Sequence, residues 1–122
     1  MANPKILLVD DSDDHRDLLK VLFDNEGYHL ECAANGREAL ELLKAMQELP
    51  AFILLDLMMP VMDGYAFREE QLQDLRLASI PVVVMTADGN VANKTKKMGV
   101  GEFIHKPANV DHLLGTARRY CT

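Results

Sequence analysis

The sequence contains no long run of apolar residues, since its longest runs are only a few residues and too short to cross a bilayer as a helix. The N-terminal residues MANPK lack the charged and apolar regions of a secretory signal, so we expect a cytoplasmic protein. The two cysteines, Cys32 and Cys121, lack CxxC spacing, which predicts a small core residue and an exposed thiol without a disulfide or zinc site. Internal repeats, low-complexity tracts and linkers are also missing.

The composition is that of a globular chain. Apolar residues make up 48% and charged residues 26% of 122 residues, which excludes a disordered or membrane-spanning protein. This length is typical of one domain with a continuous core, so we expect residues 1–122 to form a single domain.

Charge is distributed unevenly. Residues 1–88 carry seven Lys/Arg and seventeen Asp/Glu, whereas residues 89–122 carry six Lys/Arg and two Asp/Glu. The acidic part argues against a broad nucleic-acid surface. We therefore expect neither nucleic acid nor membrane as a direct partner, and the basic last quarter needs a separate explanation.

Strand and helix patterns alternate along the whole chain. The predicted strands cover residues 5–10, 28–34, 51–56, 80–87 and 102–107. The predicted helices cover residues 13–27, 37–49, 65–75, 90–99 and 109–120. Because the strands are apolar throughout instead of alternating, they predict an α/β fold with a parallel sheet that helices cover on both faces.

Ligands of such sheets bind beyond the carboxyl ends of the strands, so the residues at these ends matter most. Four of the predicted strands end in polar or chemically useful groups, while the second ends in two alanines. These groups are Asp10 and Asp11, Asp56, Thr86 with the Ala87 amide, and Lys106 before Pro107. They should converge at one edge of the sheet.

Three carboxylates at one edge repel each other, by about 4 kcal/mol for a pair about 4 Å apart at an effective dielectric constant near 20. Lys106 supplies one positive charge, and a divalent cation would supply more. With oxygen ligands and no histidine or cysteine expected nearby, Mg²⁺ or Mn²⁺ is favoured over zinc. Thr86 and the Ala87 amide offer donors to a phosphate oxygen.

Other interpretations exist for the single residues. Asp13 and Asp14 fall in the first turn of a predicted helix, where acids complement the helix dipole and Ser12 is a suitable cap. His15 is interpreted as a solvated helix residue and not as a phosphodonor. Taken alone, Asp56 could be a loop acid and Lys106 a surface lysine; the set is more specific than its members.

The motifs ILLVDD, ILLDLMMPVMDG, PVVVMTA and FIHKP occur in the order and spacing typical of one family. The whole chain resembles the receiver domain of two-component response regulators. The resemblance implies a flavodoxin-like, doubly wound five-stranded sheet of order 2-1-3-4-5 with five helices. It also implies a stand-alone phosphoacceptor module without a separate output domain.

By the same resemblance, Asp56 is the phosphoacceptor, which receives a phosphoryl group from a sensor histidine kinase or a phosphotransfer protein. Asp11, Asp56 and the main-chain carbonyl of Met58 would hold Mg²⁺, with Asp10 assisting through water. Lys106, Thr86 and the Ala87 amide would contact phosphoryl oxygens. The bond before Pro107 is expected to be cis, as is usual in the family.

The resemblance also implies a switch and an output surface. Phosphorylation would draw Thr86 toward the phosphate and let Phe103 turn inward; the less favoured alternative is that Phe103 is only a core aromatic. The output face is the surface of the fourth helix, fifth strand and fifth helix. Its basic residues, which suggest an acidic downstream partner or simply a solvated face, are Lys94, Lys96, Lys97, Arg118 and Arg119.

Two other functions use the same residue types. A Mg²⁺-dependent phosphohydrolase with an aspartyl nucleophile would also need an acid two residues after the nucleophile, where this chain has Met58. A receiver-like interaction domain that is never phosphorylated would not need the complete set of acids, threonine and lysine. We therefore expect a phosphoacceptor that catalyses its own phosphorylation and dephosphorylation, and not an enzyme acting on other molecules.

One departure from the family pattern lies in the third predicted helix. Arg68 and Gln71 occupy positions where relatives often have apolar residues, so the packing of this helix cannot be inferred from the pattern.

Overall fold

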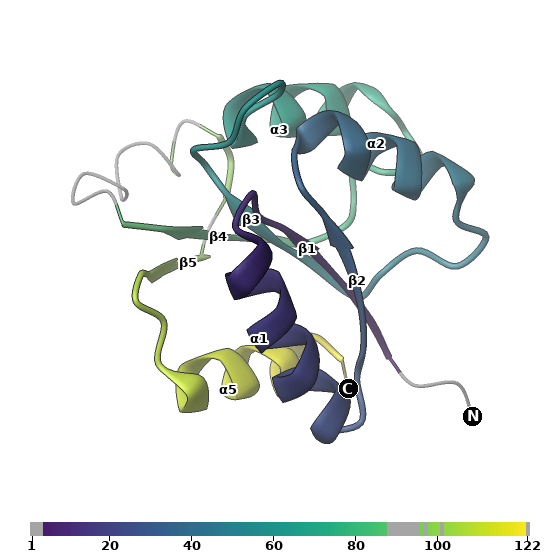
Figure 1. Cartoon of the computed structure of the whole chain (residues 1–122). Helices are drawn as coiled ribbons and strands as arrows, with labels where there is room; N and C mark the ends of the chain where they lie inside the picture. Colours follow the sequence, from purple (N-terminus) through teal and green to yellow (C-terminus); the bar gives the residue numbers. More distant parts are fainter. Residues whose placement is uncertain (1–3, 88–95, 97, 101, 122) are drawn as a thin grey trace.

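The structure, a computed structural model, describes residues 4–87, 96, 98–100 and 102–121. Its strands form one parallel sheet in the order β2-β1-β3-β4-β5 (Figure 1). The strands are β1 (Lys5–Val9), β2 (His29–Ala33), β3 (Phe52–Asp56), β4 (Val82–Thr86) and β5 (Glu102–His105). The helices are α1 (Asp13–Asn25), α2 (Gly36–Ala45), α3 (Gly64–Gln73) and α5 (Val110–Tyr120). The α/β class, the flavodoxin-like doubly wound sheet and its order 2-1-3-4-5 are confirmed.

The fourth helix, predicted over residues 90–99, falls mostly outside the described residues. That the chain is a single domain without a separate output domain stays a prediction. No helix in the described part of the chain is long and apolar enough to span a bilayer.

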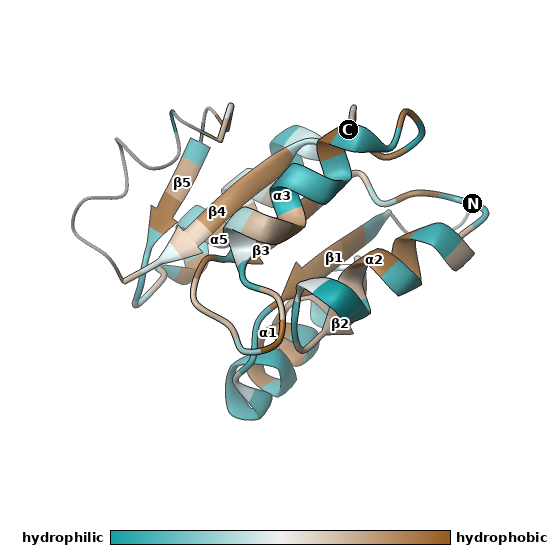
Figure 2. Ribbon diagram, turned by 90° about the horizontal axis from the view of Figure 1, so that it is seen from above, coloured by the Kyte–Doolittle hydropathy of each residue, from teal (hydrophilic) through white to brown (hydrophobic). Residues whose placement is uncertain are grey.

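Helices cover both faces of the sheet. In Figure 1, α2 and α3 lie above the strands, and α1 and α5 lie below them. Alternate strand residues supply two cores: Val9 and Leu55 pack toward the first pair of helices, whereas Leu8 and Leu54 pack toward the second pair. Strands that are buried on both faces need continuous apolar sequence, and Figure 2 shows this as brown ribbon along β1 and β4.

Capping residues determine where the helices begin. In each described helix, a Ser, Asn or Asp side chain accepts a hydrogen bond from the backbone N–H three residues later. These N-caps are Ser12, Asn35, Asp63 and Asn109. The predicted cap at Ser12, with Asp13 and Asp14 in the first helical turn, is confirmed.

Two local predictions are wrong. Helix α2 ends at Ala45 and not near Leu49, because Arg76 donates hydrogen bonds to the carbonyls of Leu43 and Met46 and satisfies the end of the helix. Cys121 is half-buried and not an exposed thiol, because it packs against the core beneath α5.

The register of the strands brings the predicted residues to one edge. Val9 pairs with Leu55, so the residues that follow them, Asp10 and Asp56, lie side by side. Thr86 pairs with His105, which places Lys106 just beyond the end of β4. Residues far apart in the sequence therefore meet at the carboxyl ends of β1, β3 and β5.

Candidate functional site

Three acids meet at the carboxyl ends of β1 and β3. Asp10 has no exposed surface and Asp56 is 6% exposed, whereas Asp11 is exposed. One carboxylate oxygen from each of these residues lies within 4.8 Å of the others. The sheet therefore brings together the acids that the sequence predicted at this edge.

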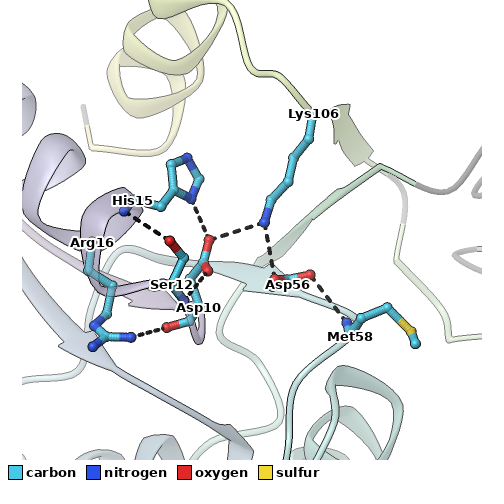
Figure 3. A network of polar contacts seen from close by, with 7 residues as sticks. All are labelled: Asp10, Ser12, His15, Arg16, Asp56, Met58 and Lys106. Atoms are coloured by element: carbon cyan, nitrogen blue, oxygen red, sulfur yellow. Dashed lines mark hydrogen bonds and ion pairs between the residues drawn. The ribbon is translucent and has the colours of Figure 1, made fainter.

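Lys106 lies between two of the acids. Its Nζ donates to Asp10 Oδ2 at 3.2 Å and to Asp56 Oδ2 at 3.1 Å (Figure 3). Its backbone N–H donates to the Thr86 carbonyl at 2.9 Å, which fixes the start of the β5–α5 loop. The bond between Lys106 and Pro107 is cis, as predicted. One ammonium group is thus shared between two buried carboxylates.

Asp10 receives further hydrogen bonds from the start of α1. The Ser12 N–H donates to Asp10 Oδ1 at 2.9 Å, and His15 Nδ1 lies 2.5 Å from Asp10 Oδ2. Arg16 donates from Nη1 to the main-chain carbonyl of Asp10 at 2.6 Å. Every side-chain oxygen of this buried acid therefore has a donor.

The interpretation of His15 as a solvated residue is wrong, and so is the expectation that no histidine lies near the acids. Its side chain is 24% exposed and points toward Asp10 (Figure 3). A carboxylate only accepts hydrogen bonds, so the proton in this contact belongs to Nδ1. The available signal was the cap at Ser12, since a helix that begins at Asp13 places its third residue above the end of β1.

The environment shifts the pKa values of the two buried acids in opposite directions. Burial raises the pKa of Asp10, but hydrogen bonds from Ser12 and His15 and the charge of Lys106 outweigh burial and leave this pKa below its ordinary value. Burial also raises the pKa of Asp56, and here Lys106 and the Met58 N–H offset only part of the effect. The pKa of Asp56 is therefore above its ordinary value.

Lys106 stays protonated. Burial lowers the pKa of its ammonium group, but the hydrogen bond to Asp56 and the charges of Asp10 and Asp56 outweigh burial and raise the pKa. The lysine therefore places a positive charge between the two acids.

The loop from β3 to α3 forms another wall of the site. The Met58 N–H donates to Asp56 Oδ1 at 3.2 Å, so both oxygens of Asp56 accept a hydrogen bond. The Met58 side chain is 69% exposed and points away from the acids (Figure 3). Two residues later the chain makes a tight turn around Val61, where the Met62 N–H donates to the Pro60 carbonyl at 2.7 Å and the φ angle of Val61 is 67°.

The donor set fits a hard divalent cation. Carboxylate oxygens from Asp10, Asp11 and Asp56 are the ligands that Mg²⁺ prefers in proteins. His15 does not change this preference, because its nearer nitrogen already donates to Asp10. That the Met58 carbonyl is a ligand stays a prediction, although hydrogen bonding of the Met58 N–H keeps this residue next to Asp56.

The other predicted residues lie around this centre. Thr86 is the last residue of β4 and is 2% exposed, and Ala87 follows it at the surface. Phe103 is half-buried in β5, where it packs against the core on the α2/α3 side. It also makes a T-shaped contact with the His105 ring, with ring centroids 5.8 Å apart. The roles of these residues in phosphoryl binding and switching stay predictions.

Known proteins share this sequence pattern and fold. Residues 6–118 match the response regulator receiver domain family. Sporulation initiation phosphotransferase F of Bacillus subtilis is 36% identical, and the match covers 98% of this chain and 95% of that protein. Response regulator Rre1 of Synechocystis is 35% identical, but this chain spans only 52% of its length.

Solved structures of receiver domains and response regulators have the same fold as this chain. The chemotaxis response regulator CheY4 of Vibrio cholerae superposes with a TM-score of 0.85 at 31% identity, covering 97% of this chain and 98% of that one. The receiver domain of a signal transduction histidine kinase from Syntrophus aciditrophicus gives a TM-score of 0.85 at 32% identity, covering 97% and 89% of the two chains.

Several curated relatives are about twice as long as this chain, which spans about half their length. Receiver domains are phosphoacceptors that interact with histidine kinases and downstream targets, and they are not enzymes in the ordinary sense. The comparisons therefore do not favour a phosphohydrolase. The chain belongs to the response regulator receiver domain family of two-component signalling systems.

Proposed function

We propose that Asp56 is the phosphoacceptor of this receiver domain and takes a phosphoryl group from a phosphohistidine on a sensor histidine kinase or a phosphotransfer protein. The observation that carries the proposal is the position of the Lys106 ammonium group, 3.1 Å from Asp56 Oδ2 at an edge where three acids meet. A phosphoryl group on Asp56 would therefore lie next to this positive charge.

In this reaction an Asp56 carboxylate oxygen attacks the phosphorus atom, a P–O bond forms, and the P–N bond to the donor imidazole breaks. The imidazole nitrogen keeps the bonding electron pair, and the product is an acyl phosphate. Hydrolysis removes the phosphoryl group again: a water oxygen attacks the phosphorus, the P–O bond to Asp56 breaks, and inorganic phosphate and the Asp56 carboxylate are released. We propose that the chain catalyses both of its own reactions by positioning and charge neutralisation.

The residues of the chain have distinct parts in these steps. Lys106 would pair with one phosphoryl oxygen, the Thr86 hydroxyl would donate to a second, and the Ala87 amide would donate to a third. The attacking group is the Asp56 carboxylate, and its raised pKa disfavours the ionised form that the attack needs. A positive charge near Asp56 therefore promotes the reaction.

Mg²⁺ would supply this charge, with Mn²⁺ as an alternative. We propose that Asp11, Asp56 and the Met58 carbonyl hold it, with Asp10 assisting through water. When bound there, it would offset the charge of the acids and the charge that develops on the phosphoryl oxygens. The exposed position of Asp11 beside buried Asp10 and Asp56 supports this assignment, because it leaves one side of the acid cluster accessible.

The switch is proposed to follow from phosphorylation. Thr86 would move toward the phosphoryl group and Phe103 would turn into the space it leaves, which changes the surface of β5 and α5 for a downstream protein. Since Phe103 has no hydroxyl, this switch would depend on packing alone.

An acidic downstream partner is proposed for the output face. In the described part of this face, the positive charge that is available to a partner is smaller than the sequence suggests. Arg119 forms a bidentate ion pair with Glu102 at 2.7 and 2.8 Å, so part of its charge is already neutralised. Lys96 is exposed on the same face, while Lys94 and Lys97 lie outside the described residues. A cytoplasmic location stays a prediction of the sequence.

The proposal is tested by incubating the protein with acetyl phosphate, with and without Mg²⁺, and measuring the intact mass. We expect a Mg²⁺-dependent gain of one phosphoryl group in the wild type and none in Asp56→Asn. Asp14→Asn is the matched control, because Asp14 is an exposed acid in the first turn of α1 and should leave phosphorylation unchanged. An equal mass gain in Asp56→Asn and the wild type would overturn the proposal.

A further inference from the structure

Asp10 is a fully buried carboxylate that depends on three donors. The Ser12 N–H bonds to its Oδ1, and both Lys106 Nζ and His15 Nδ1 bond to its Oδ2 (Figure 3). A buried carboxylate is stable only while its partners compensate for the water that it has lost. If one donor is removed, the remaining donors must therefore stabilise the buried carboxylate by themselves.

Lys106 is the donor that phosphorylation would remove. In the unphosphorylated structure its ammonium group divides its contacts between Asp10 and Asp56. A lysine that turns toward a phosphoryl group on Asp56 weakens or breaks its contact with Asp10. Phosphorylation would thus leave the buried Asp10 carboxylate with one direct donor fewer.

His15 is held where it can provide that help. Its backbone N–H donates to Ser12 Oγ at 3.2 Å, so the helix cap fixes the residue in the first turn of α1. Its Nδ1 is 2.5 Å from Asp10 Oδ2, which is closer than Lys106 Nζ at 3.2 Å. The two contacts of His15, with Ser12 and with Asp10, do not involve Asp56, so both can persist when Asp56 is phosphorylated.

We propose that His15 is a positioning residue that holds the Asp10 carboxylate through Nδ1–H and thereby releases Lys106 for the phosphoryl group. The inference rests on the proposed function, because it gives His15 a part in the phosphorylation of Asp56. A neutral imidazole with its proton on Nδ1 is sufficient for this role, so it does not depend on a change in the charge of His15.

Substitutions of different shape separate this role from simple packing. His15→Leu keeps a bulky side chain and removes the donor. His15→Asn places an amide N–H near the position of Nδ1, whereas His15→Gln carries its amide one bond further, near the position of Nε2. The proposal therefore predicts that Asn replaces the histidine and that Leu and Gln do not.

His112→Leu is the matched control. His112 is the third residue of α5, it is exposed, and its backbone N–H donates to the Asn109 cap at 3.2 Å, the same distance as in the cap of His15. Helix position and capping are thus alike in the two histidines, and only His15 contacts an acid of the site.

The experiment measures the rate of phosphoryl gain from acetyl phosphate at saturating Mg²⁺ over a range of acetyl phosphate concentrations. We expect His15→Leu and His15→Gln to lower the maximal rate by roughly tenfold or more, as for loss of a hydrogen bond to a charged group. The half-saturating concentration should stay unchanged, because the ring contact of His15 is with Asp10 and not with the phosphoacceptor Asp56. His15→Asn should restore the rate to within about threefold of the wild type, and His112→Leu should leave it unchanged.

A second measurement needs neither metal nor phosphoryl donor. The ¹⁵N resonance of Lys106 Nζ reports the hydrogen bonds of this group in the metal-free protein. We expect it to shift in His15→Leu and His15→Gln, because Lys106 must then compensate for Asp10 alone, and to stay near the wild-type position in His15→Asn and His112→Leu. This readout remains usable in Gln and Asn variants if the Leu variant fails to fold.

The outcomes distinguish the two proposals. If the wild type gains no phosphoryl group, the proposed function fails and the role of His15 fails with it. If the wild type is phosphorylated and His15→Leu and His15→Gln match its rate and its Lys106 resonance, the role of His15 alone is overturned. Equal slowing in all three His15 variants also overturns it, because the Asn donor would then have no effect.

Discussion

At the scale of single residues, Gln71 shows how a polar group is accommodated in the core. Its side chain has no exposed surface, and its amide nitrogen donates to the carbonyls of Leu77 and Ile80 at 3.0 and 3.1 Å. Its amide oxygen accepts a hydrogen bond from Arg68 at 2.8 Å, and Arg68 also donates to the Met98 carbonyl. The polar pair thus connects α3 to the segments that precede and follow β4 in the sequence.

We therefore predict that Gln71→Leu destabilises the protein by about 2–4 kcal/mol in urea unfolding followed by circular dichroism. The substitution suits the apolar pattern of the family, but it removes the Gln71 donor from the Ile80 and Leu77 carbonyls and removes one acceptor of Arg68. Of the two carbonyls, that of Leu77 keeps the Ile80 N–H as a donor. Gln73→Leu is the control, because Gln73 is exposed on the same helix and should change the unfolding free energy by no more than about 0.5 kcal/mol. Equal effects of the two substitutions would contradict this account.

Single residues were predictable where their role follows from position at a strand end. Asp10, Asp56 and Lys106 meet as expected because parallel strands end at the same edge. The contacts of His15 and Gln71 were not predictable from the periodicity of apolar residues, because a helical position specifies a direction only after the helix is docked. For His15 the predicted cap at Ser12 was the available signal. His15 points to Asp10 because α1 begins directly after the Ser12 cap. The periodicity of apolar residues does not specify that starting residue.

At the scale of elements, the close approach of α3 to β3 shapes the site. A Cβ atom added to Gly64 would lie 2.6 Å from the Asp56 carbonyl oxygen and 2.9 Å from Leu57 Cα. Both neighbours are backbone atoms, so they can move only if the end of β3 moves. Glycine at the first position of α3 therefore lets the helix pack directly against the strand that carries Asp56.

We predict that Gly64→Ala lowers the unfolding free energy by about 1–3 kcal/mol and slows phosphoryl gain on Asp56, because the strand end must shift. Gly115→Ala is the matched control. Gly115 lies within α5 with nothing within 4 Å of an added Cβ, so this substitution should stabilise the protein by about 0.5–1 kcal/mol and leave phosphorylation unchanged. Urea unfolding and intact-mass kinetics measure both effects, and a stable, fully active Gly64→Ala variant would refute the packing argument.

The elements themselves were largely predictable, and their ends were less so. Continuous apolar strands and amphipathic helices indicated the α/β order correctly, since both patterns follow directly from which faces are buried. The end of α2 was misplaced because Arg76, about thirty residues later in the sequence, satisfies its last carbonyls. Such a contact depends on the tertiary fold and leaves no local signal.

At the scale of the whole molecule, the acid cluster links stability to metal binding and pH. The raised pKa of Asp56 means that its ionised form destabilises the metal-free fold, even with Lys106 beside it. This destabilisation is absent below the ordinary pKa of 3.8 and develops as pH rises through the higher pKa of the folded state. It is fully present once the pH exceeds the pKa of the folded state, unless a bound cation offsets it.

We therefore predict that Asp56→Asn is more stable than the wild type at pH 7 in EDTA, and that the difference in unfolding free energy shrinks as the pH falls toward 3.8. Mg²⁺ should act in the opposite sense, because it binds the folded wild type and stabilises it by about 2.7 kcal/mol at a concentration one hundred times the dissociation constant. Asp56→Asn should lose most of this gain. Urea unfolding at several pH values, with EDTA or Mg²⁺, measures all of these differences. If the wild type is instead the more stable protein in EDTA at pH 7, Lys106 more than compensates for the burial of Asp56. The cation would then be needed for the chemistry alone and not to offset a buried charge.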